Sequence, residues 1–201
     1  MRKSYLALGD SYTIGEQVPL FDSFPYQLIQ LLRKQNKQES WLAPEIVAKT
    51  GWTTDELLQQ IDQTQLLPKY DLVTLLIGVN NQYRGRTVEN YREEFWLLLQ
   101  KAIAFAGGQL EQVVVISIPD WGKTPFAQER DTAHIEQEID AYNLACKQIT
   151  EAADVRFVDI TTFQRADAHD LQFMAADGLH PSGKEYAKWA VKVCGLVAPL
   201  P

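Results

Sequence analysis

The sequence has little of what several protein classes require. It contains only two cysteines in 201 residues, Cys146 and Cys194. Their spacing is not that of metal ligands, so neither a disulfide-rich scaffold nor a zinc module is expected, and both are predicted to be small core residues. No window approaches the roughly 18 consecutive apolar residues of a membrane-spanning helix. The densest runs, 72–79 and 113–118, are interrupted or only as long as a strand. A transmembrane segment is therefore not expected.

Long blocks of one charge are also missing. The chain has 19 Lys and Arg against 26 Asp and Glu, a formal net charge of −7. An acidic balance without a basic stripe argues against nucleic acid as a partner. Near the N-terminus only four apolar residues, 5–8, follow the basic pair Arg2 and Lys3 before polarity returns. This is too short for a signal-peptide core, so a cytoplasmic protein is expected.

What is present is typical of a soluble globular chain: 46% of the residues are apolar and 22% are charged. This balance excludes a disordered chain, a collagen-like chain and a coiled coil. At about 150 residues per domain, the length predicts a single domain over residues 1–201. The oligomeric state stays open.

Short apolar runs alternate with amphipathic stretches along the whole chain. Several runs are apolar on both faces, as expected for strands buried between two helix layers. The predicted strands are 5–8, 45–48, 72–77, 113–118 and 155–160. Helices are predicted after Ser23, after the capping-box spacing Thr53-x-x-Glu56, over 87–105, over 131–153, and from a capping Ser182 to about Cys194. This alternation predicts one three-layer α/β/α domain with a five-stranded parallel sheet.

Ligands of such a sheet bind outside the carboxyl ends of its strands. Residue types used in catalysis follow every predicted strand except the fourth. The stretches are Gly9-Asp10-Ser11-Tyr12-Thr13, Thr50-Gly51-Trp52-Thr53, Gly78-Val79-Asn80-Asn81 and, after a connecting stretch, Asp177-Gly178-Leu179-His180-Pro181-Ser182.

These four blocks, in this order, resemble the SGNH hydrolases, also called the GDSL esterase/lipase family. Each block alone is a weak signal, but four at predicted strand ends are specific. The resemblance implies a flavodoxin-like SGNH hydrolase fold, a nucleophile at Ser11, an oxyanion hole that includes Gly51 and Asn80, and a catalytic Asp177 and His180. It implies neither a metal nor an organic cofactor.

The chemistry of the residues leads to the same roles. The Ser11 hydroxyl is a poor nucleophile until a base takes its proton, and an imidazole such as that of His180 suits this task. Asp177, three positions earlier, can orient the imidazole through a turn. The backbone N–H groups of Ser11 and Gly51 and the side-chain amide of Asn80 can donate to the oxyanion that forms when an ester carbonyl is attacked.

Each residue also has a purely structural interpretation. Ser11 could cap a helix, Gly51 and Asn80 could be turn residues, and Asp177 could be a solvated loop charge. The competing histidines are poorly placed, because His134 and His169 fall in polar surface stretches. Gly178 is expected to serve the turn, and Asp10 to hold the nucleophile loop.

The third block departs from the common family pattern, Gly-x-Asn-Asp, because Asn81 stands in the place of the aspartate. An amide there cannot use all the donors that would support a buried carboxylate. The hydrogen bonds around this loop are therefore expected to differ, with the role of Asn80 unchanged.

Substrate choice is less determined. The candidate substrate-binding residues, near the predicted site loops, are Tyr12, Val79, Tyr83, Trp121 and Phe126. They suit a small or medium ester better than a long chain, although these side chains could simply pack the loops. Phe173 lies near the same loops, and Arg84 and Arg86 could meet an anionic group of the substrate.

The sequence therefore predicts a serine hydrolase that acts on a small-molecule acyl ester through an acyl-enzyme. Candidate substrates are short-chain acyl esters, O-acetylated sugars, lysophospholipids and thioesters. One alternative is a non-catalytic domain that binds a ligand in a retained site, but such a site would have lost Ser11, Asn80 or His180. A phosphate- or nucleotide-binding domain is the other, but the chain has no glycine-rich phosphate motif.

Overall fold

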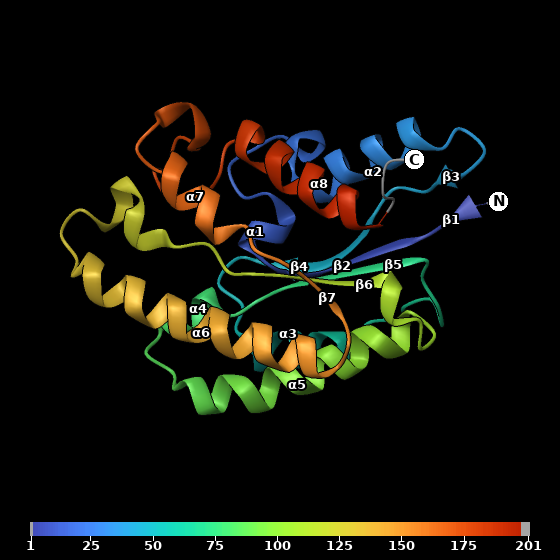
Figure 1. Ribbon diagram of the computed structural model, residues 1–201, viewed down its shortest axis with the longest axis horizontal. Coiled ribbons are helices and arrows are strands. Elements are labelled where there is room, and N and C mark those ends of the chain that lie inside the picture. Colours follow the sequence, from blue (N-terminus) through green and yellow to red (C-terminus); the bar gives the residue numbers. More distant parts are fainter. Residues whose placement is uncertain (1, 198–201) are drawn as a thin grey trace.

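The computed structural model describes residues 2–197 and shows a parallel sheet between two layers of helices (Figure 1). The five strands of the sheet, in the spatial order β4-β2-β5-β6-β7, are all parallel. Their bounds are β2 Tyr5–Asp10, β4 Glu45–Lys49, β5 Leu72–Leu76, β6 Val113–Ile116 and β7 Arg156–Val158. The predicted three-layer α/β/α fold with a five-stranded parallel sheet is confirmed.

Helices cover both faces of the sheet (Figure 1). One layer contains α1 Ser11–Ile14, α2 Phe24–Gln35, α7 Thr161–Asp167 and α8 Gly183–Val197. The other contains α3 Thr54–Gln63, α4 Val79–Tyr83, α5 Val88–Phe105 and α6 Thr132–Ala152. Short 3-10 turns lie at Leu20–Asp22, Leu110–Gln112, Trp121–Lys123, Pro125–Ala127 and Leu171–Phe173.

The apolar sequences of the central strands follow from their position. Every residue of β2, β5 and β6 is buried, because helices pack on both faces of these strands. The helices bury only one side, as α3 shows with Leu57 and Ile61 inward. Cys146 and Cys194 are buried free thiols, as predicted.

Some local predictions differ from the structure. A second, two-stranded parallel sheet pairs β1 Arg2–Lys3 with β3 Ser40–Trp41, and α7 occupies part of the expected connecting stretch. The capping box at Thr53 is present. Ser182 directly precedes α8, and its hydroxyl donates to the Gln172 carbonyl oxygen at 2.7 Å.

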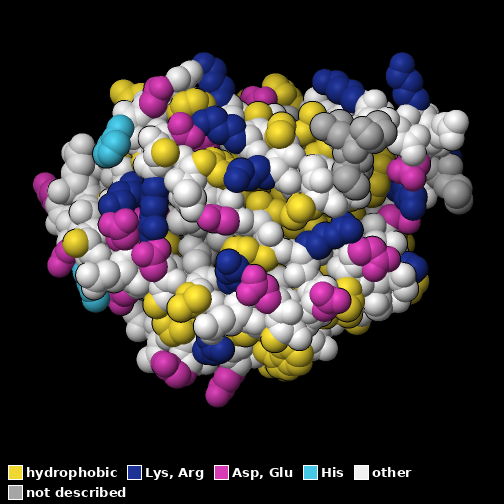
Figure 2. Space-filling model, viewed as in Figure 1, with side chains coloured by type: hydrophobic (Ala, Val, Ile, Leu, Met, Phe, Trp, Pro, Cys, Tyr) yellow, Lys and Arg dark blue, Asp and Glu magenta, His cyan; other side chains and the backbone are white. Residues whose placement is uncertain are grey.

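The carboxyl ends of the strands lie together on the left of Figure 1, where α1 and α4 begin. The loops that carry the sequence blocks therefore converge at this edge. Lys and Arg side chains are mixed with Asp and Glu over the face shown in Figure 2. No helix within residues 2–197 combines the length and the apolar character needed to cross a bilayer.

Candidate active site

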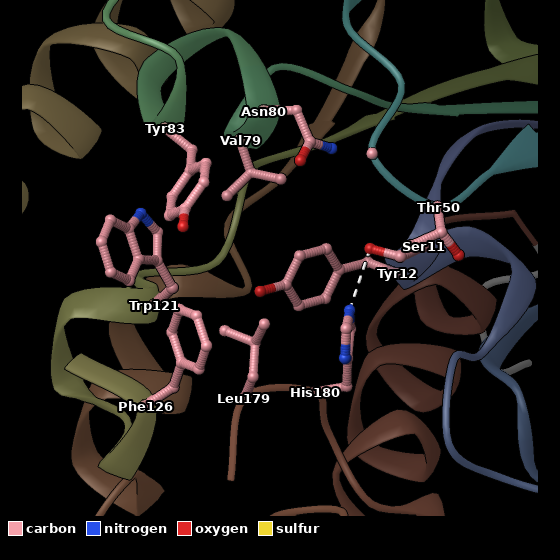
Figure 3. A pocket seen from close by; sticks show the side chains of 11 residues that line it. Ser11, Tyr12, Thr50, Val79, Asn80, Tyr83, Trp121, Phe126, Leu179 and His180 are labelled. Atoms are coloured by element: carbon pink, nitrogen blue, oxygen red, sulfur yellow. Dashed lines mark hydrogen bonds between the residues drawn. The ribbon is translucent and has the colours of Figure 1, made fainter. Parts of the chain in front are cut away.

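Ser11, His180 and Asp177 lie in hydrogen-bond contact although Ser11 and His180 are 169 residues apart in the sequence. His180 Nε2 is 3.0 Å from Ser11 Oγ (Figure 3). His180 Nδ1 is 2.6 Å from Asp177 Oδ2. Ser11 is the first residue of α1, directly after β2, and the other two lie in the loop before α8. The geometry is that of a nucleophile, a base and a group that orients the base.

The loop between Asp177 and His180 is held by the same carboxylate that contacts the imidazole. Asp177 Oδ1 accepts the backbone N–H groups of Leu179 and His180, both at 3.0 Å. Gly178 has a φ of +66°, a conformation that glycine adopts without strain, so it serves the turn. Partial burial raises the pKa of Asp177, but the His180 ring and these N–H groups outweigh burial and leave it below its usual range. Asp177 is therefore a carboxylate at neutral pH.

Asp10 holds the turn that presents Ser11. It is fully buried, and its Oδ1 accepts the backbone N–H of Tyr12 at 3.0 Å, which caps α1. Burial raises the pKa of Asp10 to about 7, against the lowering effect of that hydrogen bond. Among residues 2–197, no hydrogen bond joins this carboxyl group to the His180 ring.

Gly51 lies in the loop after β4 and lines the same cavity as Ser11. Its φ of +84° favours glycine, whereas an added Cβ would meet only Arg84 Nη2 at 3.7 Å. Glycine is thus required by backbone conformation and not by lack of space. Within residues 2–197 its N–H has no hydrogen-bond partner, which leaves a free donor at the cavity.

Asn80 joins the loops around this donor. It lies in α4, just after β5, and its Nδ2 donates to the Trp52 carbonyl oxygen at 3.0 Å and lies 3.5 Å from Asp10 Oδ2. The Asn80 amide therefore links the loop of Asp10 to the loop of Trp52, and Asn80 also lines the cavity.

Asn81 makes hydrogen bonds that need an amide. Its Oδ1 accepts the backbone N–H of Thr54 at 3.1 Å, and its Nδ2 donates to Thr54 Oγ1 at 2.6 Å. Thr54 Oγ1 in turn donates to the carboxylate of Glu94. The threonine proton is already used, so a carboxylate at position 81 would have no proton to accept from this hydroxyl.

A cavity of about 230 Å³ opens beside Ser11 (Figure 3). Its lining residues are Ser11, Tyr12, Thr50, Gly51, Val79, Asn80, Tyr83, Trp121, Phe126, Leu179 and His180. All five residues predicted to bind substrate are among them. The polar groups gather near Ser11, and the far wall is apolar and aromatic.

The aromatic wall is fixed by polar contacts behind it. The Trp121 ring packs edge-on against Tyr83 and Phe126, with centroids 5.2 and 6.1 Å apart. Its Nε1 donates to Gln82 Oε1 at 2.7 Å, and Gln82 Nε2 donates to Glu138 Oε2 at 2.8 Å. The indole is therefore held by a chain of hydrogen bonds that reaches α6.

Three further residues singled out in the sequence lie near this edge. Phe173 lines a separate, smaller cavity. Arg84 donates to the Gly51 carbonyl oxygen at 2.5 Å and pairs with Glu56 at 3.3 Å, and Arg86 pairs with Asp55, so both guanidinium groups have partners within the protein.

Several residues that line or support the cavity were not predicted from the sequence. Leu179 and Thr50 line the cavity, and Gln82 and Glu138 support its wall. Leu179 and Thr50 belong to the quoted blocks and could have been considered from their position. Across residues 2–197, no group of three or more His, Cys, Asp or Glu side chains is arranged to hold a metal ion.

Comparison with known proteins identifies the family of this chain. The sequence matches the GDSL-like Lipase/Acylhydrolase family over residues 7–188. Spore germination lipase LipC from Bacillus licheniformis is 22% identical, over 96% of this chain and 95% of its own length.

Solved structures share the fold. The lipase/acylhydrolase from Enterococcus faecalis superposes with a TM-score of 0.68 at 22% identity, covering 96% of this chain and 93% of its own. Axe2, an acetylxylan esterase from Geobacillus stearothermophilus, superposes with a TM-score of 0.74 at 18% identity, covering 98% and 94%. The family match spans most of the chain, and the chain therefore belongs to the GDSL-like lipase/acylhydrolase family of carboxylic ester hydrolases.

Proposed function

We propose that this chain is a serine esterase that hydrolyses esters of short or medium acyl groups through an acyl-enzyme on Ser11. The observation that carries the proposal is the 3.0 Å separation of Ser11 Oγ and His180 Nε2, with Asp177 at the other ring nitrogen. We also propose that residues 1–201 form one hydrolase domain, because the family match covers 7–188.

In the first half of the reaction, Ser11 Oγ bonds to the ester carbonyl carbon as its proton passes to His180 Nε2. The oxyanion accepts hydrogen bonds from the Ser11 and Gly51 N–H groups and from Asn80 Nδ2. His180 then gives the proton to the leaving oxygen as the carbon–oxygen bond breaks. Asp177 keeps the ring in the required tautomer and stabilises the imidazolium.

In the second half, a water molecule attacks the acyl-enzyme. His180 takes the water's proton, and the same donors stabilise the second oxyanion. The bond between the acyl carbon and Ser11 Oγ breaks, and the proton returns to the serine. The carboxylic acid leaves and the enzyme is restored.

The cavity supports a limit on acyl length. Its volume of about 230 Å³ lies below the roughly 300–1,000 Å³ of pockets that hold drug-sized ligands. Long acyl chains would have to extend beyond it. One similar protein is named a lipase and another an acetylxylan esterase, so their names do not agree on the alcohol part of the substrate. The proposed limit therefore concerns only the acyl group and rests on the cavity.

The test is hydrolysis of p-nitrophenyl esters, and the matching thioesters, from acetate to decanoate by wild type and Ser11→Ala. Wild type should prefer the shorter half of the series, and the variant should lose about 10⁴-fold or more in kcat. Ser40→Ala, which removes an exposed serine from β3, is the matched control and should retain full activity.

A phosphonate that reacts with nucleophilic serines tests the covalent step separately. It should label wild type at Ser11 and leave Ser11→Ala unlabelled. Undiminished hydrolysis by Ser11→Ala would refute the acyl-enzyme on Ser11. No turnover of any ester or thioester by wild type would refute the esterase proposal in favour of a non-catalytic binding domain.

A further inference from the structure

Tyr12 carries a hydroxyl group that the protein leaves without a partner at the acyl cavity. The residue is only 3% exposed and lines the cavity beside Ser11. In the part of the chain that is described, no hydrogen bond reaches its hydroxyl. Other buried tyrosines differ: Tyr5 bonds to Thr74 at 2.8 Å, and Tyr91 donates to the Ile77 carbonyl oxygen at 3.2 Å.

The Tyr12 hydroxyl is also accessible, unlike another unpartnered one. The hydroxyl of Tyr186 is sealed inside the protein, whereas that of Tyr12 is not among the sealed polar atoms. Figure 3 shows the Tyr12 ring lying along the cavity with its oxygen away from Ser11, between Trp121 and Leu179. The hydroxyl therefore meets whatever fills the inner part of the cavity.

The side chains that flank this oxygen in Figure 3 offer it no hydrogen-bond partner. Leu179 and the ring of Trp121 flank it, and the indole N–H of Trp121 points to Gln82 instead. Burial, followed by the charges of Asp10, Asp177 and Asp120, raises the pKa of Tyr12, so the phenol keeps its proton. An all-carbon acyl chain would cover this donor and leave it unsatisfied, which is unfavourable.

We propose that the Tyr12 hydroxyl selects acyl groups that carry an oxygen atom partway along the chain, such as alkoxyacyl, hydroxyacyl or oxoacyl esters. This rests on the proposed esterase function, and it concerns the acyl side of the same site. The oxygen accepts the phenol proton where an alkyl chain would offer only a methylene. The ring itself is fixed, because it contacts His180 and Trp189 at centroid distances of 5.1 and 6.3 Å.

The experiment compares p-nitrophenyl hexanoate with the esters in which the third, fourth or fifth chain carbon is replaced by an ether oxygen. Each kcat/KM is divided by the rate of alkaline hydrolysis of the same ester, which removes the inductive effect of the oxygen. For at least one position, wild type should favour the ether ester, and this preference should fall about tenfold in Tyr12→Phe. Tyr26→Phe is the control, since Tyr26 lies in α2 and is not among the residues that line the cavity.

Equal preferences in wild type and Tyr12→Phe at every position would overturn the inference. A water molecule that stays bound to the hydroxyl would give this same negative result. If Tyr12→Phe does not fold, the wild-type series decides alone. The inference is overturned if wild type shows no normalised preference for any of the ether esters. Hydrolysis of the hexanoate ester that depends on Ser11 would leave the esterase proposal standing in that case. Loss of all ester hydrolysis would instead refute the proposed function.

Discussion

Asn81 and Thr54 exchange two hydrogen bonds that join the second and third loops of the site. The amide oxygen accepts the Thr54 N–H at 3.1 Å, and the amide nitrogen donates to the hydroxyl at 2.6 Å. The hydroxyl is free to accept because it donates to Glu94. The Thr54 hydroxyl thus needs one donor and one acceptor, which are the amide of Asn81 and the carboxylate of Glu94.

Asn81→Asp should destabilise the protein by about 2 kcal/mol at pH 7, because two carboxylates would then compete for one hydroxyl proton. Glu94→Gln in the same chain should restore much of the loss, since its amide can donate to Thr54 and leave the hydroxyl proton for the new carboxylate. Urea unfolding of both single variants and the double variant measures the coupling. An Asn81→Asp protein as stable as wild type, or no recovery in the double variant, would contradict this account.

Gln82→Leu should weaken the processing of larger acyl groups by displacing Trp121. The buried indole N–H loses its acceptor, which costs about 1–3 kcal/mol and loosens the cavity wall. KM should rise for hexanoate esters and change little for acetate. Glu138→Gln is the matched control, because an amide oxygen there can still accept from Gln82. An equal change in KM for the hexanoate and acetate esters would contradict the role of Gln82 in supporting the cavity wall.

Asn80→Ala should lower kcat by about 10²- to 10³-fold with KM nearly unchanged, because its bond to the substrate oxygen strengthens mainly in the transition state. Loss of the hydrogen bond to Trp52 should also reduce stability by about 1 kcal/mol. Asn36→Ala, at an exposed position after α2, controls for loss of an asparagine. Steady-state kinetics and thermal unfolding separate the two effects, and an unchanged kcat would remove Asn80 from the mechanism.

Asp10 should make the protein less stable as the pH rises. A carboxyl whose pKa moves from 3.8 to about 7 on folding takes up a proton when the chain folds. Its contribution to stability is therefore complete below pH 3.8, declines between 3.8 and about 7, and is lost above that. The decline is about 4 kcal/mol at most. Urea unfolding of wild type and Asp10→Asn at several pH values should show this slope in wild type alone. Parallel curves would contradict it.

The sheet was predictable because its strands are short apolar runs that tolerate burial on both faces. The strands β1 and β3 were not, since two residues are too few to form a pattern. The α7 helix buries Thr161 and Gln164, which bond to Ser117 and Asp120. Polar residues inside give no hydrophobic periodicity, so this helix could not be read from the sequence.

The candidate site divides in the same way. Ser11 and Asn80 could be singled out because each belongs to a short block directly after a strand, and His180 because its block resembles the last block of the family pattern. The link from Trp121 through Gln82 to Glu138 could not, because it joins three elements by contacts that no local spacing records. The missing partner of Tyr12 is likewise a property of the folded surroundings.

The packing of α8 against α2 has a consequence for the order in which the protein assembles. Gln27 in α2 donates from Nε2 to the Gly183 carbonyl oxygen at 2.7 Å, next to the loop that carries His180. Ser11 and His180, 169 positions apart, can meet only after the segments near the two ends of the chain have docked. Closing such a long loop is a slow, nonlocal event, whereas individual helices form in microseconds. During refolding, esterase activity should therefore return after the helical signal, and its return reports the docking of α8 against α2.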